Sequence, residues 1–91
     1  MRVSRSKRFN QELLEITKFI ATNNPKNGRN FYEGVRAFVE KITDHPHKGR
    51  LSNDGNRELI HKGYTIPYLV DEENIVILGI FNQNEWKPKK L

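Results

Sequence analysis

The residues that decide the fold are 64–81, which read YTIPYLVDEENIVILGIF in this 91-residue chain. Large apolar or aromatic side chains recur at every second position from 64 to 70, which is the period of a β-strand. Residues 75–81 are almost continuously apolar, a pattern that favours a strand covered on both faces. We therefore predict two strands joined by the polar turn at residues 71–74.

A third strand is predicted at residues 57–62, joined to the strand at 64–70 by a tight turn at Lys62-Gly63. The three strands then form a small antiparallel meander, and residues 2–6 are a candidate for a further strand. Pro67 lacks an amide hydrogen and cannot donate to a neighbouring strand. Either the pairing is bulged at Pro67, or its amide position faces an unpaired side.

Two helices are predicted in the first half of the chain. Ser6 is a candidate cap for a helix that ends near Thr22, and Asn24 is a candidate cap for a second helix with Pro25 at its first position. The apolar stripes of the two helices are Phe9, Leu13, Ile16 and Ile20, then Phe31, Val35, Phe38 and Ile42. The second helix is expected to end before His45, and residues 45–56 read as a loop.

The expected fold class is therefore α+β, with an antiparallel helical hairpin packed on one face of a small, mainly antiparallel sheet. We expect one domain over residues 1–91, with a short basic tail at 87–91. Four large side chains lie off the helical stripes: Leu14, Phe19, Tyr32 and Val39. Some of them should be exposed and form an apolar patch for a partner.

Composition narrows the classes of function. The formal net charge is +5, and basic residues concentrate at both ends of the chain, which favours an anionic partner. Cysteine is absent, and the three histidines are too scattered to predict a metal site. The N-terminus lacks the apolar core of a signal peptide, and no apolar run is long enough to span a membrane. We expect a cytoplasmic protein without a cofactor or metal.

Several segments together resemble the ParE/RelE toxin superfamily. They are Asn24-Pro25, Pro46-x-x-Gly49-Arg50, Arg57-Glu58-Leu59, Tyr64-x-Ile66-x-Tyr68-x-Val70 and Ile75-x-Ile77-Leu78-x-Ile80. The resemblance spans about residues 3–86. It implies a β-α-α-β-β-β order and a toxin of a type II toxin–antitoxin pair, bound by an acidic segment of its antitoxin.

Members of the superfamily act in two ways. RelE-type toxins cleave mRNA on the ribosome, whereas ParE-type toxins poison DNA gyrase. Asn82 stands where many RelE-type members carry histidine, and an amide cannot exchange a proton near neutral pH. The resemblance therefore favours a ParE-like inhibitor of gyrase with no catalytic residues. The alternative is a ribosome-dependent mRNA endonuclease that uses Arg57, His61 and Lys62.

Two sets of contact residues follow from this assignment. The set expected to bind the target is Arg50, Arg57, Tyr64, Trp86, Lys87, Lys89 and Lys90. The set expected to bind the antitoxin is Phe19, Arg29, Tyr32, Arg36 and Val39. Other roles stay open: Arg57 can clamp a phosphate or pair with Glu58 or a helix carboxylate, and Trp86 can stack on a base or cap the core.

Overall fold

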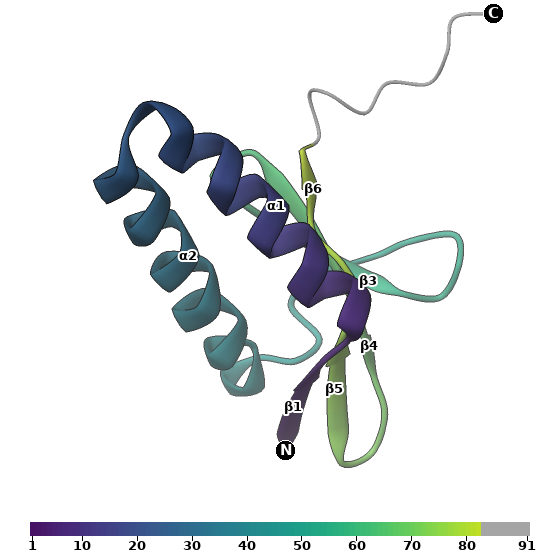
Figure 1. Cartoon of the computed structure of the whole chain (residues 1–91). Helices are drawn as coiled ribbons and strands as arrows, with labels where there is room; N and C mark the ends of the chain where they lie inside the picture. Colours follow the sequence, from purple (N-terminus) through teal and green to yellow (C-terminus); the bar gives the residue numbers. More distant parts are fainter. Residues whose placement is uncertain (83–91) are drawn as a thin grey trace, which may run out of the picture.

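Two helices lie side by side on one side of a β-sheet in the computed structural model, which describes residues 1–82 (Figure 1). This arrangement confirms the predicted α+β class. The elements in chain order are β1 Arg2–Arg5, α1 Lys7–Asn23, α2 Pro25–Glu40, the 3-10 turn η1 Lys41–Asp44, β2 Arg50–Leu51, β3 Arg57–His61, β4 Tyr64–Val70, β5 Asn74–Ile77 and β6 Phe81–Asn82.

The helix starts are the ones predicted. The hydroxyl of Ser6 accepts a hydrogen bond from the amide of Phe9 at 2.9 Å, and the side chain of Asn24 accepts one from Asn27 at 3.1 Å. Pro25 occupies the first turn of α2, where a missing amide hydrogen costs nothing. These local signals alone account for both helix starts.

The buried stripe of α2 differs from the prediction at one position. Val39, expected to be exposed and to bind the antitoxin, is 0% exposed and belongs to the core. The buried stripe runs through Phe31, Val35 and Val39, each one turn from the next. Phe38 is half-buried and packs on the ring of His61 instead. The prediction was wrong because Val39 and Phe38 both fit a helical period, and only the sheet beneath decides which one is covered.

The sheet order among the described residues is β1-β5-β4-β3-β2, and β6 also pairs with β4. Strands β3, β4 and β5 form the predicted antiparallel meander, while β1 adds to β5 in parallel. The prediction of a loop over residues 45–56 was wrong in part, because β2 lies within it and pairs with β3. Its two residues join the edge through backbone atoms, so side-chain periodicity gives no signal.

The turn between β3 and β4 has the predicted position. Lys62 and Gly63 have φ values of 55° and 85°, the two consecutive positive values that a type I′ hairpin turn requires. Glycine adopts such angles without strain. Lys62 also takes a positive φ, because the strands on either side of the turn pair in register.

The last apolar run, residues 75–81, was predicted to form one strand, and it forms parts of two, β5 and β6. β5 ends at Ile77 and β6 begins at Phe81, and part of the intervening backbone bonds to the side chains of Ser6, the cap of α1, and Glu12 of α1. Ser6 donates its hydroxyl to the carbonyl of Leu78 at 3.0 Å, and a carboxylate oxygen of Glu12 accepts from the amide of Ile80 at 2.9 Å. The break therefore leaves these polar groups satisfied.

Pro67 faces this break. Its carbonyl accepts from the amide of Leu78 at 2.9 Å, and the amide and carbonyl of a strand residue point to the same side. The missing donor of Pro67 therefore faces the segment where neither β5 nor β6 pairs with β4. The sequence left two alternatives, an irregular pairing at Pro67 or an amide position that faces an unpaired side. Both apply, because residues 78–80 interrupt the neighbouring strand and leave the amide position of Pro67 without a paired strand.

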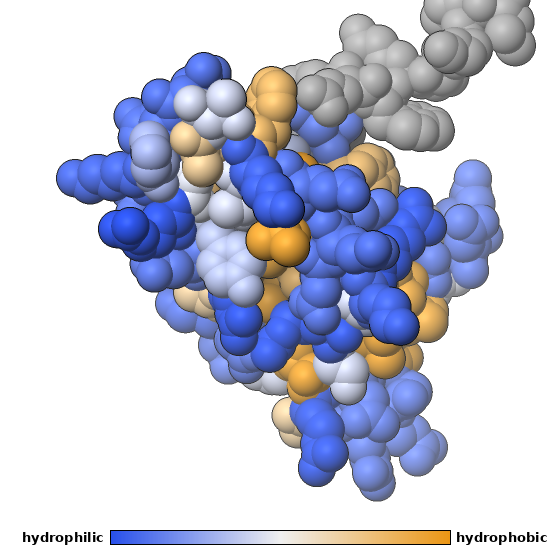
Figure 2. Space-filling view, viewed as in Figure 1, coloured by the Kyte–Doolittle hydropathy of each residue, from blue (hydrophilic) through white to orange (hydrophobic). Residues whose placement is uncertain are grey.

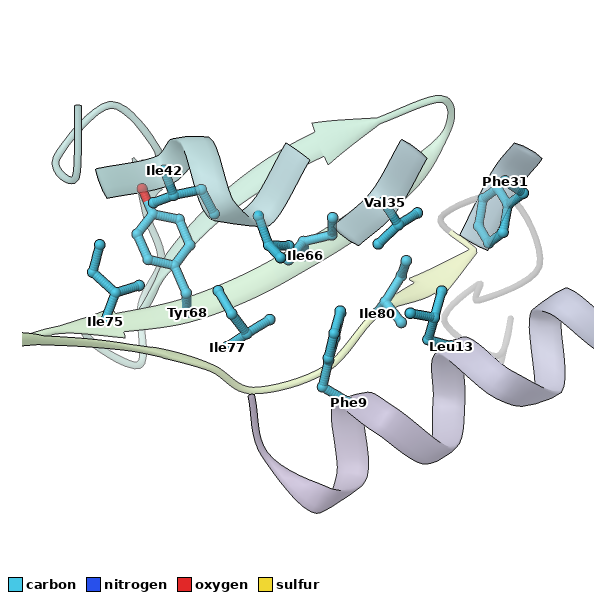
Figure 3. Close-up of a cluster of buried hydrophobic side chains, with 11 residues drawn as sticks. Phe9, Leu13, Phe31, Val35, Ile42, Ile66, Tyr68, Ile75, Ile77 and Ile80 are labelled. Carbon is cyan, nitrogen blue, oxygen red and sulfur yellow. The ribbon is translucent and has the colours of Figure 1, made fainter. Parts of the chain in front are cut away.

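The core fills the space between the helices and one face of the sheet, as Figure 3 shows. Side chains of α1, α2, β4 and β5 meet there, and the buried residues are Phe9, Leu13, Phe31, Val35, Val39, Ile42, Ile66, Tyr68, Ile75, Ile77 and Ile80. On β5 burial alternates between neighbours, so the expected cover on both faces is wrong. Only one face carries helices, because the described chain supplies a single helical layer.

Candidate functional site

A hydrogen-bonded cluster ties the loop after η1 to the sheet. The buried hydroxyl of Tyr68 donates to the carbonyl of Pro46 at 2.9 Å and accepts from the amide of Gly49 at 3.0 Å. Arg57, the residue opposite Tyr68 on β3, donates to the carbonyls of His47 and Gly49 at 3.2 Å and 2.9 Å. A Cβ at position 49 would lie 2.6 Å from the hydroxyl oxygen of Tyr68, so this close approach requires glycine.

Arg57 therefore has a structural partner that the sequence did not indicate. The predicted pairing with Glu58 or a helix carboxylate was wrong, because the guanidinium bonds to backbone carbonyls and Glu58 pairs with Arg50 at 3.0 Å. A guanidinium engaged in this way has fewer donors left to clamp a phosphate. Arg50, also predicted to bind the target, has a side chain that is 76% exposed at the edge of the sheet.

His61, the candidate general base, lies under α2. Its ring packs against Phe38 with centroids 4.4 Å apart, and its Nε2 is buried without a hydrogen-bond partner among the described residues. Burial and the neighbouring charge of Lys62 lower the pKa of His61 from its ordinary value of 6.5. The buried Nε2 therefore has no direct path to a substrate hydroxyl.

This burial predicts a pH dependence of stability. Because the pKa of His61 is lower in the folded chain than in the unfolded chain, the unfolded chain binds more protons below about pH 6.5. The free energy of unfolding should fall as the pH drops through that value, by at most about 1.4 kcal/mol per pH unit from this group. His61→Phe keeps an aromatic ring against Phe38 and should lose this part of the slope. Urea unfolding at pH 7 and pH 5.5 measures it; equal slopes in both proteins would contradict the assignment.

The other candidate catalytic residue, Lys62, lies in the turn beyond β3. Arg57 and His61 stand at the two ends of β3, so their Cα atoms are about 13 Å apart. Tyr64 is half-buried and its ring contacts Phe31 at a centroid distance of 5.0 Å. The described residues thus do not bring the predicted nuclease side chains together at one exposed point.

Two of the predicted antitoxin contacts do meet in a groove between the helices. Tyr32 and Arg36 line a hollow of about 400 Å³ with Arg5 and Leu14. The guanidinium of Arg36 lies 5.7 Å from the centre of the Tyr32 ring and donates to its hydroxyl at 3.2 Å. Arg5 also pairs with Glu40 of α2 at 2.6 Å. The groove therefore combines apolar surface with positive charge.

Sequence reasoning missed Arg5 as a member of this groove. The only sequence signal is weak: Arg5 lies two residues from Val3 on β1, which places both on the helix-covered face, where Arg5 is opposite Ile77. Leu14 was recognised as lying off the helical stripe, and it is 48% exposed. In Figure 2, small hydrophobic patches of this kind interrupt a largely hydrophilic surface on the helical side of the molecule.

The remaining predicted antitoxin contacts lie elsewhere. Phe19 is 71% exposed on α1 and lines a separate hollow of about 300 Å³ with Glu15 and Phe81. Arg29 is exposed in the first part of α2, and Val39 is buried. The predicted target contacts Trp86, Lys87, Lys89 and Lys90 lie outside the described residues. Within residues 1–82 no group of three His, Asp or Glu is placed to hold a metal ion, and no helix is long and apolar enough to span a membrane.

Comparison with known proteins supplies an independent line of evidence. A family model described as the ParE toxin of the type II toxin-antitoxin system, parDE, matches residues 3–85. Among solved structures, a chain of the chromosomal ParDE TA system from P. aeruginosa is similar with a TM-score of 0.80 and 19% identity. That match covers 90% of this chain and 95% of the other, and at this identity it supports the fold alone. A comparison with curated protein sequences finds no match.

Proposed function

The chain belongs to the ParE toxin family of type II toxin–antitoxin systems, and on this premise we propose that it inhibits DNA gyrase by binding. Membership implies an antitoxin as its partner. The proposal that gyrase is the target is supported by the contacts of the residues that a nuclease would need. One guanidinium nitrogen of Arg57 bonds to two backbone carbonyls, and Nε2 of His61 is buried beside Phe38, so part of the chemistry of each group serves the fold.

The antitoxin is proposed to bind in the groove between α1 and α2. An acidic, amphipathic segment fits this groove, because Leu14 and Tyr32 offer apolar surface and Arg36 offers an exposed positive charge. Complementary charge speeds association and makes it sensitive to salt. Arg29, exposed earlier on α2, is proposed to add to the same attraction.

The target contact is proposed to include the basic end of the chain. Trp86 can anchor on a partner surface, and a buried aromatic anchor contributes about 2 kcal/mol or more to binding. The screened attraction of one exposed lysine, such as Lys87, contributes about 1 kcal/mol or less. Trp86→Ala is therefore proposed to weaken inhibition more than any single substitution among Lys87, Lys89 and Lys90.

A supercoiling assay with purified gyrase tests the proposal. We expect the wild-type chain to inhibit supercoiling or to trap cleaved DNA at micromolar concentration, and His61→Phe to inhibit equally well because His61 has no chemical role. In parallel, programmed ribosomes given the same protein should keep their mRNA intact. Site-specific mRNA cleavage that His61→Phe abolishes, with no effect of the wild type on gyrase, would replace the proposal by the nuclease alternative.

A further inference from the structure

A hollow of about 300 Å³ lies between α1 and β6, outside the groove proposed for the antitoxin (Figure 1). Three aromatic side chains line it: Phe19 from α1, Tyr64 from β4 and Phe81 from β6. Phe19 is 71% exposed, the largest exposed fraction among the large apolar side chains of residues 1–82. A concave surface lined by aromatic side chains favours a bound ligand or partner.

Carboxylates give this hollow a negative charge. Glu12 is held in place, because one of its oxygens accepts from the amide of Ile80 at 2.9 Å and the other pairs with Arg8 at 3.0 Å. Glu15, one turn further along α1, also lines the hollow; it is exposed and forms no ion pair with another residue of the described chain. Glu15 therefore places an unbalanced negative charge beside the aromatic side chains.

The nearest unpaired basic side chains do not line the hollow. Lys18 is exposed on α1 next to Phe19 in the chain, and Lys62 is exposed in the turn before β4. Neither forms an ion pair with Glu15, and no lysine or arginine of residues 1–82 is among the lining residues. The charge of an exposed lysine is screened by salt over about 10 Å, so these two weaken the negative potential of the hollow without filling it.

We propose that this hollow, lined by Glu15, Phe19, Tyr64 and Phe81, receives an arginine or lysine side chain of the target protein. The inference rests on the proposed function, since it names the chemistry by which gyrase is held. A cation is attracted to the face of an aromatic ring, and a carboxylate beside the ring pairs with the same cation. The acidic antitoxin segment does not fit here, because Glu12 and Glu15 would repel it.

The placement of the two sites around α1 keeps the two partners apart. The groove proposed for the antitoxin is lined by residues 10, 13 and 14 of α1, whereas the hollow is lined by residues 12, 15, 16 and 19. At 3.6 residues per turn, the centres of these two sets are about 180° apart around the helix. An antitoxin segment in the groove therefore leaves the hollow open to a second protein.

Titration with a small cation tests the chemistry of the hollow without gyrase. N-acetyl-L-arginine methylamide, added to the full chain, should shift the aromatic NMR signals of Phe19 and Tyr64 in a saturable way. Two controls should each bind at least about threefold more weakly: the uncharged N-acetyl-L-norleucine methylamide with the wild type, and the arginine probe with Glu15→Gln. No saturable shift, or equal binding of both probes, overturns the inference. It is also overturned if the arginine probe binds only after Lys87, Lys89 and Lys90 are changed to glutamine, because the chain's own lysines then fill the hollow.

Charge reversal tests the partner. Glu15→Lys should need at least about tenfold more protein for half-inhibition of gyrase, because like charges then meet in the hollow. The matched variant Glu33→Lys, exposed on α2, carries the same change of charge and should stay within about threefold of the wild type. The affinity of Glu15→Lys for the antitoxin should change by less than about threefold, because the groove lies on the other side of α1. Circular dichroism checks the fold, and Phe19→Ala is the second variant if Glu15→Lys does not fold.

Growth arrest on expression in cells separates a failure of this inference from a failure of the gyrase proposal. Unchanged inhibition by a folded hollow variant, Glu15→Lys or Phe19→Ala, shows that the target binds elsewhere. Loss of antitoxin affinity in that variant, with inhibition unchanged, assigns the hollow to the antitoxin and also overturns the inference. If the wild type arrests growth without inhibiting gyrase, gyrase is the wrong target, and the hollow variant then decides the inference by whether growth arrest is lost. A wild-type protein that does neither overturns both proposals.

Discussion

Tyr68→Ala is expected to lower the free energy of unfolding by about 3–5 kcal/mol, the cost of emptying a buried aromatic site. Tyr68 is 0% exposed, and its hydroxyl is bonded to Pro46 and Gly49. The substitution therefore leaves a cavity under α2 and two backbone groups without their partner. Since a small domain is stable by about 5–15 kcal/mol, the variant should lose a large part of its stability.

One further variant separates the contribution of the Tyr68 ring from that of its hydroxyl, and a second serves as a control. Tyr68→Phe keeps the packing and removes both hydrogen bonds, so it should cost about 1–3 kcal/mol. Leu69→Ala changes the next residue, which lies on the face of the sheet that carries no helix, and it should lower the free energy of unfolding by less than about 1 kcal/mol. Urea unfolding at constant pH measures all three. If Tyr68→Phe were as stable as the wild type, the hydroxyl would not hold the loop, and the structural role given to this cluster would be incorrect.

Alanine at two glycines of α2 is expected to change stability in opposite directions. A Cβ on Gly28 would lie 2.7 Å from the Cβ and 3.1 Å from the Cα of Ala21, so the two helices must separate. Overpacking of this kind costs about 1–3 kcal/mol. A Cβ on Gly34 would approach only Nε2 of His61, at 3.9 Å, which is ordinary contact. Gly34→Ala should therefore show only the gain in helix propensity, about 1 kcal/mol.

The comparison of the two glycines gives the measurement its own control. Both sites are within one helix and receive the same substitution, so a difference of about 2 kcal/mol or more in the free energy of unfolding reports the helix contact alone. Adding Ala21→Gly to Gly28→Ala should restore part of the loss, because the nearer of the two contacts is removed. Equal effects at Gly28 and Gly34 would mean that the close approach of the helices is not needed for stability.

Features set by neighbours in the chain were predictable. Ser6 and Asn24 cap their helices through side chains that bond three residues ahead, and Lys62-Gly63 turns because glycine tolerates a positive φ. The period of two along β4 was also informative, because it persists over seven residues. Such signals act within one turn or one strand, so the sequence displays them without knowledge of the fold.

The candidate site was predicted less well. Tyr32 and Arg36, predicted as antitoxin contacts, line one groove because one helical turn separates them, and their role stays a prediction; the same groove is also lined by Arg5 from β1. Arg57 and His61 were named for their chemistry, yet the first serves the loop and the second packs under Phe38. Charge and pKa make a residue a candidate; the groups around it determine whether it is available.

The sequence by itself determined the two helices, the meander of β3 to β5 and the covered face of β4, because each is encoded in a local period or a capping residue. Only the tertiary structure decided that Val39 replaces Phe38 in the core, that β2 forms, and that the last apolar run breaks opposite Pro67. These outcomes depend on which backbone donors and which surfaces meet across the fold. Ser6 and Glu12 satisfy the broken strand from about 70 residues away, a contact that no local pattern encodes.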